Sequence, residues 1–310
     1  PAAAAAAKKA FIITRLGDFG FLLAILYLFM NQQAFLLQGL NPFEIEHIQM
    51  LVSSEKSAAA GLIPMAPEIV TWIALGIFAG AVGKSAQFPL HTWLPDAMEG
   101  PTSVSALIHA ATMVAAGVFL VARFYPVFEA SATAMNTVAI IGAVTAIMAA
   151  SMGLVMFDIK RVLAYSTISQ LGFMMLALGI GAYGAAIFHL FNHAFFKALL
   201  FLGAGSVNHA TGTFDMRYMG GLRRVMPWTY RTFVIAAASI AGVPLLSGFW
   251  SKDEIMGAAL GHGHMGNFVF WIALVAAFFT AIYIFRAVFM TFHGEFRGGD
   301  ANSTEGKNIH

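Results

Sequence analysis

Three ionisable residues recur at intervals of four in one apolar segment of the chain. His189, His193 and Lys197 stand in AIFHLFNHAFFKALLFLG, so an α-helix places them on one face, about 6 Å apart along its axis. Imidazoles gain and lose protons near neutral pH, and a desolvated lysine does so more readily than a lysine in water. The pattern therefore predicts a proton relay, which Asn192 could extend.

Two other interpretations of these histidines were weighed. A buried histidine is often a hydrogen-bonded packing residue, but three ionisable groups in register favour a relay. A metal site fits less well, because no carboxylate or cysteine accompanies the histidines on that face. A further histidine, His109 in SALIHAATMVAAG, is a candidate extension of the relay, and packing alone explains it equally well.

Lysine is rare inside apolar segments, yet Lys84, Lys197 and Lys252 all lie there. A lysine at the centre of a bilayer costs on the order of 3 kcal/mol, so a functional role is the first explanation. The alternative is that the side chain reaches the membrane surface, which suits Lys84 and Lys252, each near a helix break, better than Lys197.

Helix-breaking residues stand beside two of these lysines, and Asp253 follows the second directly. Proline and glycine interrupt helices, and at membrane depth such breaks mark ion pathways. The break-forming residues are Pro89, Pro95 and Pro101 after the first lysine, and Gly242, Pro244 and Gly248 before the second. Two breaks, each beside a lysine, suggest an internal repeat.

Asp18 is the carboxylate of the first apolar segment, with Arg15 one turn before it. It is predicted to pair with Lys84, so that its movement would change the affinity of the lysine for a proton. The alternative is a local ion pair between Arg15 and Asp18.

The elements that must position these residues are membrane helices. The chain of 310 residues is 59% hydrophobic and 10% charged. A membrane helix needs roughly 20 apolar residues. Segments of this kind predict an all-α membrane protein of about eight transmembrane helices, two of them broken; they are 8–31, 66–86, 101–124, 132–157, 159–180, 182–207, 229–260 and 265–292.

The basic residues also predict an orientation. With eight alternating spans, one side collects most of the Lys and Arg residues, whereas the other has Lys56 and Arg123. Cytoplasmic loops are enriched in Lys and Arg, so the first side is expected to be cytoplasmic. It holds Lys8, Lys9, Arg15, Lys160, Arg161, Arg217, Arg223, Arg224, Arg231, Arg286, Arg297 and Lys307.

Composition excludes several classes of function. The chain has no Cys, which excludes disulfides, thiolate metal sites and cysteine-ligated iron–sulfur clusters. The net charge of +2 is spread over the loops, so nucleic acid is not an expected partner. The first residue is Pro1, and no cleavage pattern follows the first apolar run, so we expect an interior piece of a longer protein rather than a signal peptide.

Several motifs together resemble one known family, the antiporter-like subunits of respiratory complex I (NADH:quinone oxidoreductase), of the subunit L or chain 5 type. This family is similar to the A subunit of multisubunit Na⁺/H⁺ antiporters. The motifs cover most of the chain; they are KKAFIITRLGD, VGKSAQFPLHTWLPDAMEGPTSVSALIHAATMVAAGVFLVAR, FDIKRVLAYSTISQLG, FHLFNHAFFKALLFLGAGSV, GFWSKDEI and FRAVFMTFHGEFR.

The resemblance implies two inverted five-helix repeats, with one broken helix in each. Residues 1–125 would hold the last three helices of the first repeat, 126–297 the whole second repeat, and 298–310 a polar tail. The implied path begins with Asp18 and the broken-helix Lys84, connects through His109, follows the axis of His189, His193 and Lys197, and leaves at Lys252 with Asp253. The family's glutamate on the preceding helix and its long lateral helix have no counterpart in this chain.

The resemblance also implies a function and partners. The chain would be a proton-translocating subunit in a bacterial inner membrane, in contact with the bilayer, other membrane subunits of complex I and a neighbouring antiporter-like subunit. NADH, FMN, iron–sulfur clusters and quinone would belong to partner subunits, and this chain would carry no cofactor or metal. The alternatives are a subunit of a multisubunit Na⁺/H⁺ antiporter and a passive scaffold.

Overall fold

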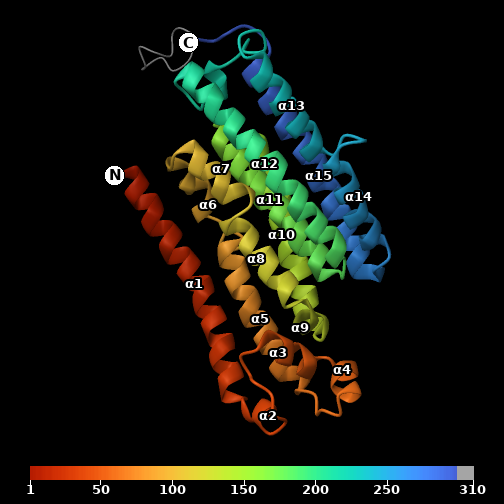
Figure 1. Cartoon of the computed structure of the whole chain (residues 1–310). Coiled ribbons are helices and arrows are strands. Elements are labelled where there is room, and N and C mark those ends of the chain that lie inside the picture. Colours follow the sequence, from red (N-terminus) through yellow and green to blue (C-terminus); the bar gives the residue numbers. More distant parts are fainter. Residues whose placement is uncertain (299–310) are drawn as a thin grey trace.

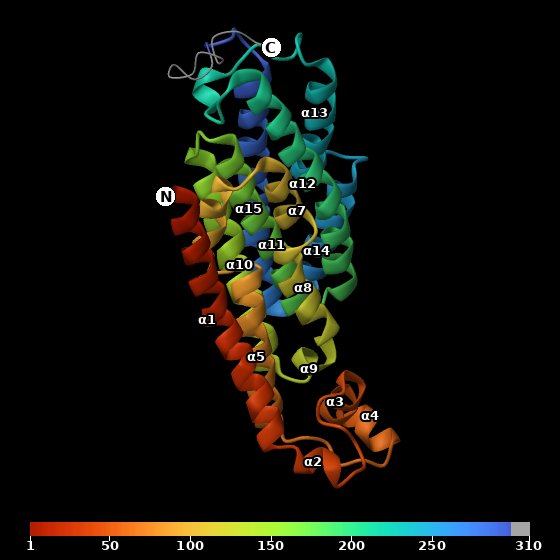
Figure 2. The ribbon, with the colours of Figure 1, turned by 60° about the vertical axis from the view of Figure 1, so that its left-hand side comes forward.

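The computed structural model describes residues 1–298, apart from the side chains of residues 54 and 55, and this part of the chain is helical. An isolated bridge between Asp158 and Asp215 is its one extended pairing. Figures 1 and 2 show long helices lying side by side with α1 at one edge, and in Figure 1 α13–α15 form the opposite edge. The long helices are α1 (Ala2–Met30), α5 (Pro67–Lys84), α7 (Thr102–Ala110), α8 (Met113–Arg123), α10 (Ala132–Val155), α11 (Ile159–Gly179), α12 (Tyr183–Thr211), α13 (Pro227–Ala241), α14 (Ser247–Leu260) and α15 (Gly263–Phe292).

Shorter helices occupy the connections. The segment between α1 and α5, predicted as an extramembrane loop, folds into α2 (Gln33–Leu36), α3 (Ile45–Val52) and α4 (Ser54–Ala59). The others are α6 (Trp93–Asp96), η1 (Ala97–Glu99), α9 (Tyr125–Glu129) and η2 (Met216–Tyr218).

The helices confirm the predicted membrane-spanning pattern. Within the described part of the chain, seven helical segments are long and apolar enough to cross a membrane, counting α7 and α8 together. The predicted span 229–260 is divided into α13 and α14, each too short to cross alone, so it is not among these seven segments.

Small residues allow the central helices to approach closely. A Cβ atom built on Gly142 of α10 would lie 2.4 Å from the backbone nitrogen of Leu176 in α11, and one on Gly179 would lie 2.2 Å from the nitrogen of Ala139. Such contacts hold membrane helices together where no hydrophobic effect acts between them. Helix α11 thereby becomes the centre of the bundle, with 94% of its most apolar window buried.

The predicted break before Lys252 is present. Helix α13 ends at Gly242, which has a φ of +86°, and α14 begins after Leu245, whose φ is +74°. Glycine adopts positive φ without the steric cost that a side chain imposes. Gly248 admits no side chain either, since its Cβ would lie 1.9 Å from the carbonyl oxygen of Ser239.

The break beside Lys84 is also present. Helix α5 ends at this lysine, and a non-helical stretch leads to the short α6 and η1. The Trp93 indole Nε1 donates to the carbonyl oxygen of Gly83 at 3.1 Å, which ties the two sides of the break together.

A third interruption was not predicted. The span 101–124 is divided at Ala111 and Thr112 into α7 and α8. The sequence there, HAATMV, holds neither proline nor glycine. The bonds that replace the helical pattern come from the Thr112 hydroxyl to the Leu107 carbonyl at 2.9 Å and from His193 of α12 to the Ala110 carbonyl. Tertiary contacts thus accompany this break.

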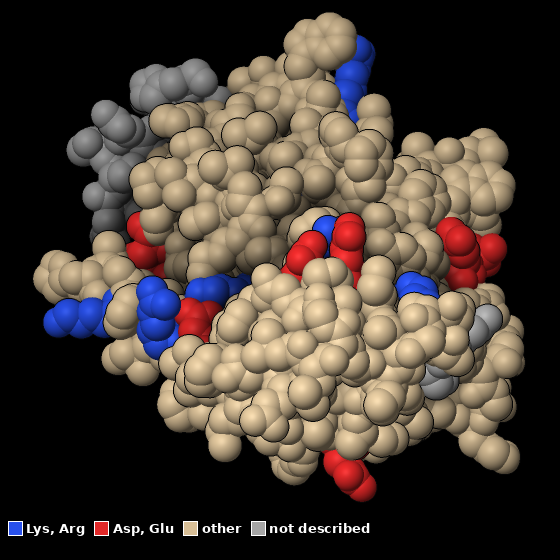
Figure 3. Space-filling view, turned by 60° about the horizontal axis from the view of Figure 1, so that its bottom comes forward, with Lys and Arg blue, Asp and Glu red and all other residues tan. Residues whose placement is uncertain are grey.

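The bundle end that carries α2–α4 has few charges. Figure 3 looks toward this end and shows a surface that is mostly uncharged, with scattered acidic and basic side chains. Lys56 lies in α4 and Arg123 ends α8, as expected for the side poor in basic residues.

Candidate functional site

The first ion pair joins α1 to α5. Lys84 Nζ donates to Asp18 Oδ2 at 3.0 Å, and Arg15 donates to the same oxygen at 3.1 Å. The helices meet through glycines beside these residues: a Cβ on Gly17 would lie 2.9 Å from the Cα of Gly83. Both predicted pairings of Asp18 therefore occur together, and the close approach of the helices makes the longer-range one possible.

Lys252 lies at the second break. Its side chain is 3% exposed, and Nζ donates to the Ile240 carbonyl oxygen at 2.6 Å. That carbonyl belongs to the last turn of α13, where helix ends leave acceptors unpaired. The amine also lies 5.4 Å from the ring centre of Phe173 in α11. The break thus supplies the acceptor that holds the lysine inside the bundle.

Asp253, predicted to act with Lys252, lies on another face of α14. Its residue is exposed whereas the lysine is buried, and successive residues of a helix do not face each other. The structure does not bring this carboxylate to the amine.

His189 is fully buried and bonded at both ring nitrogens. Nδ1 pairs with the Ser251 hydroxyl of α14 at 2.8 Å, and Nε2 pairs with Gln170 Oε1 of α11 at 3.0 Å. Three helices therefore meet at this imidazole.

The remaining members of the predicted row continue along α12. His193 Nδ1 lies 3.2 Å from the Ala110 carbonyl oxygen, at the interruption between α7 and α8. Lys197 Nζ donates to the Leu163 carbonyl oxygen of α11 at 3.1 Å. Both residues are fully buried, so the row of three lies on the inner face of α12 as predicted.

His109 joins this row from α7. The side chain is fully buried, and its ring lies 5.0 Å from the ring of Phe201 in α12. Neither ring nitrogen has a hydrogen-bond partner among the described residues, nor has Nε2 of His193. Buried polar atoms are nearly always satisfied by protein or water, so this region favours internal water.

The buried charges are all of one kind. Among residues 1–53 and 56–298, the buried ionisable residues include Lys160, Lys197, Lys252 and three histidines, but no Asp or Glu. Each lysine amine donates to backbone carbonyls rather than to a carboxylate. A buried cation without an acidic partner is costly, so these sites favour groups that alternate between the charged and neutral forms.

Comparison with known proteins places the chain in a family. Residues 1–280 match the family described as NADH:quinone oxidoreductase/Mrp antiporter, TM. The chain belongs to this family. It is therefore a multi-pass inner-membrane protein of the antiporter-like type.

Individual members of this antiporter-like family are similar over nearly the whole chain. NAD(P)H-quinone oxidoreductase chain 5 of Synechocystis sp. is 51% identical over 98% of this chain, and NADH-quinone oxidoreductase subunit L of Neisseria meningitidis serogroup A is 48% identical over 95%. These matches span 44% and 43% of those proteins, so the chain covers less than half the length of such relatives.

A solved structure of the family confirms the fold. In the structure of the Mrp complex from Dietzia sp. DQ12-45-1b, a chain that is 35% identical aligns with a TM-score of 0.79. The alignment covers 94% of this chain and 31% of that chain.

Sequence reasoning missed three buried polar residues of this antiporter-like bundle. Gln170 and Ser251 hold His189, and the amide within the apolar segment TISQLG was a signal that could have been used. Lys160 was expected in a cytoplasmic loop, yet it is 3% exposed and donates to the carbonyl oxygens of Met98 at 2.7 Å and Gly100 at 2.8 Å. Its place in α11, close after the N-cap Asp158, turns it inward.

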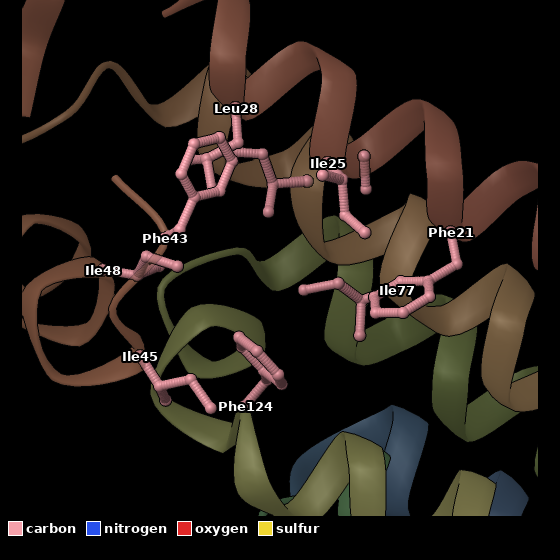
Figure 4. A pocket seen from close by; sticks show the side chains of 10 residues that line it. Phe21, Ile25, Leu28, Phe43, Ile45, Ile48, Ile77 and Phe124 are labelled. Carbon is pink, nitrogen blue, oxygen red and sulfur yellow. The ribbon is translucent and has the colours of Figure 1, made fainter. Parts of the chain in front are cut away.

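An apolar cavity lies apart from these residues. It has a volume of about 200 Å³ and is lined by α1, α3 and α5 and by the residues just before α3 and just after α8, with side chains such as Phe21, Phe43 and Phe124 (Figure 4). Its lining offers no ionisable group, so it is not the site of proton chemistry.

Proposed function

We propose that this chain is part of a proton-translocating membrane subunit of an NADH:quinone oxidoreductase. The observation that carries the proposal is the buried row of basic groups, His109, His189, His193, Lys197 and Lys252, with no buried carboxylate among the described residues. Groups held this way can take up and release protons without forming a permanent ion pair.

Each site has a distinct role in this proposal. The pair of Lys84 and Asp18 stores a proton near the first break, and its ion pair opens or closes as the lysine loses or gains charge. The buried row carries the proton through the bundle. Lys252 releases it at the second break, and Asp253, exposed on α14, accepts it at the surface.

The redox chemistry belongs to partner subunits in this proposal. The chain has no Cys for an iron–sulfur cluster. NADH, FMN, iron–sulfur clusters and quinone are therefore assigned to other subunits, and quinone reduction there drives conformational or electrostatic changes here. A neighbouring antiporter-like subunit is the expected direct partner. The names of the relatives, chain 5 and subunit L, support membership in a complex of several subunits.

The positions of the breaks favour an internal repeat. We propose that residues 1–125 complete a first repeat and that 126–297 form a second, each with one broken helix beside a lysine. The proposed tail from residue 298 lies almost wholly outside the described residues.

The test uses the whole complex reconstituted in vesicles with a pH-sensitive dye. Lys84→Met and Lys252→Met are each expected to reduce proton translocation while NADH oxidation persists, because methionine fills the space but carries no proton. Lys56→Met, an exposed lysine of α4, is the matched control. Wild-type dye responses in both test variants would show that the chain is a passive scaffold.

A second candidate is a subunit of a multisubunit Na⁺/H⁺ antiporter, which the similarity to the Mrp complex supports. The two functions differ in their driving force. In vesicles without NADH, a Na⁺ gradient would change the internal pH only if the chain belongs to a Na⁺/H⁺ antiporter. A proton signal that needs NADH and ignores Na⁺ supports the first.

A further inference from the structure

His189 has hydrogen-bond partners of unequal chemistry at its two ring nitrogens. Gln170 offers an amide oxygen, which only accepts, so Nε2 must carry a hydrogen and donate it across the 3.0 Å contact. Ser251 offers a hydroxyl, which can either donate or accept, and it lies 2.8 Å from Nδ1. The neutral imidazole therefore has its hydrogen on Nε2 and a free electron pair on Nδ1.

The Ser251 hydroxyl has a second place for its own hydrogen. Besides Nδ1 of His189, its Oγ lies 3.3 Å from the carbonyl oxygen of Ser247 and 3.5 Å from that of Gly248. When the imidazole is neutral, the hydroxyl donates to Nδ1. When Nδ1 gains a proton, the hydroxyl turns its hydrogen to a carbonyl in the first turn of α14 and accepts from Nδ1.

We infer that Gln170 and Ser251 are positioning residues that make Nδ1 the only atom through which His189 exchanges protons. This inference rests on the proposed function. A primary amide oxygen is far too weak a base to take the Nε2 hydrogen, so no proton leaves the ring through Nε2. While the ring keeps its bond to Gln170, a proton enters at Nδ1 through the Ser251 hydroxyl, which gives its own hydrogen to Nδ1 and takes another from the Lys252 side. The proton leaves by the reverse exchange, so each O–H or N–H bond that breaks is matched by one that forms.

The open side of the imidazole faces the second break. Ser251 directly precedes Lys252 in α14. His193 lies one turn further along α12, the helix that carries His189. The Tyr283 hydroxyl of α15 lies beside the Gln170 amide. His189 is thus set to exchange protons with the Lys252 side, and transfer toward His193 requires the ring to leave Gln170.

The test compares Gln170→Met and Ser251→Ala with Ser169→Ala in the intact complex. Ser169 is a buried hydroxyl of α11 that bonds the Ala146 carbonyl and does not contact His189. The quantity measured is the ratio of protons translocated to NADH oxidised, followed from mildly acid to mildly alkaline pH. Both test variants are expected to lower this ratio well below the wild-type value, because each loses a hydrogen bond that fixes the ring, while the control stays near wild type.

The pH dependence separates positioning from packing. The Gln170 oxygen stabilises the charged imidazolium more than the neutral ring, so Gln170→Met should move the alkaline limb of the profile toward lower pH. A structural defect would lower the amount of assembled complex and leave the shape of the profile unchanged, and that result overturns the inference.

Lys252→Met in the same series tells the two proposals apart. If Lys252→Met lowers the ratio but Gln170→Met and Ser251→Ala match Ser169→Ala, the proposed function stands and this inference fails. If Lys252→Met itself matches wild type, the proposed function fails.

Discussion

Replacing Asp18 by asparagine should lower the number of protons translocated per NADH oxidised. The substitution removes the charge that pairs with Lys84 beside the first break but preserves the shape of the site. At the 3.0 Å separation between Lys84 Nζ and Asp18 Oδ2, unit charges attract by about 5 kcal/mol at an effective dielectric constant of about 20. The two side chains are 32% and 25% exposed, and Arg15 shares the carboxylate, so much of this attraction is screened. A net value of about 2 kcal/mol remains, roughly a thirtyfold change in an equilibrium constant.

The assay is a double-mutant cycle in the reconstituted complex. Asp18→Asn, Lys84→Met and the double variant are compared for protons translocated per NADH oxidised. If the carboxylate acts through the lysine, the double variant should be little worse than Lys84→Met alone. Arg15→Gln is the matched control, because it removes the exposed partner of Asp18 and keeps Lys84 paired; about a twofold effect is expected from it.

This reasoning would be refuted if the two substitutions lowered proton translocation independently of each other. If the effects of Asp18→Asn and Lys84→Met multiply in the double variant, the two side chains do not act as a pair. An Arg15→Gln variant as defective as Asp18→Asn would assign the function of the carboxylate to the local pair instead.

Two predictions concern stability. Gly142→Ala should lower the melting temperature of the subunit by several degrees, because its Cβ would lie 2.4 Å from the backbone nitrogen of Leu176, whereas Gly184→Ala, with no atom within 4 Å, should not. Outside the membrane, hydrogen bonds from Arg217 lower the pKa of Asp215. This ion pair therefore stabilises the fold at neutral pH and stops doing so as the pH falls through that lowered value. Asp215→Asn should lower the melting temperature slightly at neutral pH and have no effect in acid where the wild-type carboxyl is protonated.

The helical architecture was predictable because the spans are long and the loops carry the charge. The position of Lys252 beside a helix break was predictable, because glycine and proline, here Gly242 and Pro244, interrupt helices. The inward face of α12 followed from the spacing of four between His189, His193 and Lys197. In each case the signal is local in the sequence.

The features that the sequence analysis did not predict depend on contacts between helices. The interruption at Ala111 has no proline or glycine, and its Ala110 carbonyl is satisfied by His193, which lies far away in the sequence. The contacts of Gln170 and Ser251 with His189 became visible only when α11, α12 and α14 met at one imidazole. Periodicity shows which face of a helix carries a residue, but it does not show which other helix packs against that face.

Asp253 shows that adjacency in the sequence does not imply contact in the structure. Its adjacency to Lys252 suggested cooperation, but adjacent residues on a helix point about 100° apart. The structure buries the lysine and exposes the carboxylate. Only an exchange through solvent can connect them.

The central claim is that lysines buried in the bundle carry protons, and Lys197→Met tests it most directly. This amine is fully buried, donates only to the Leu163 carbonyl oxygen among the described residues, and has no acidic partner there. In vesicles that contain the intact complex, the variant should oxidise NADH while the number of protons translocated per NADH falls well below the wild-type value. An unchanged ratio, with the variant subunit present in full amount, would contradict the account.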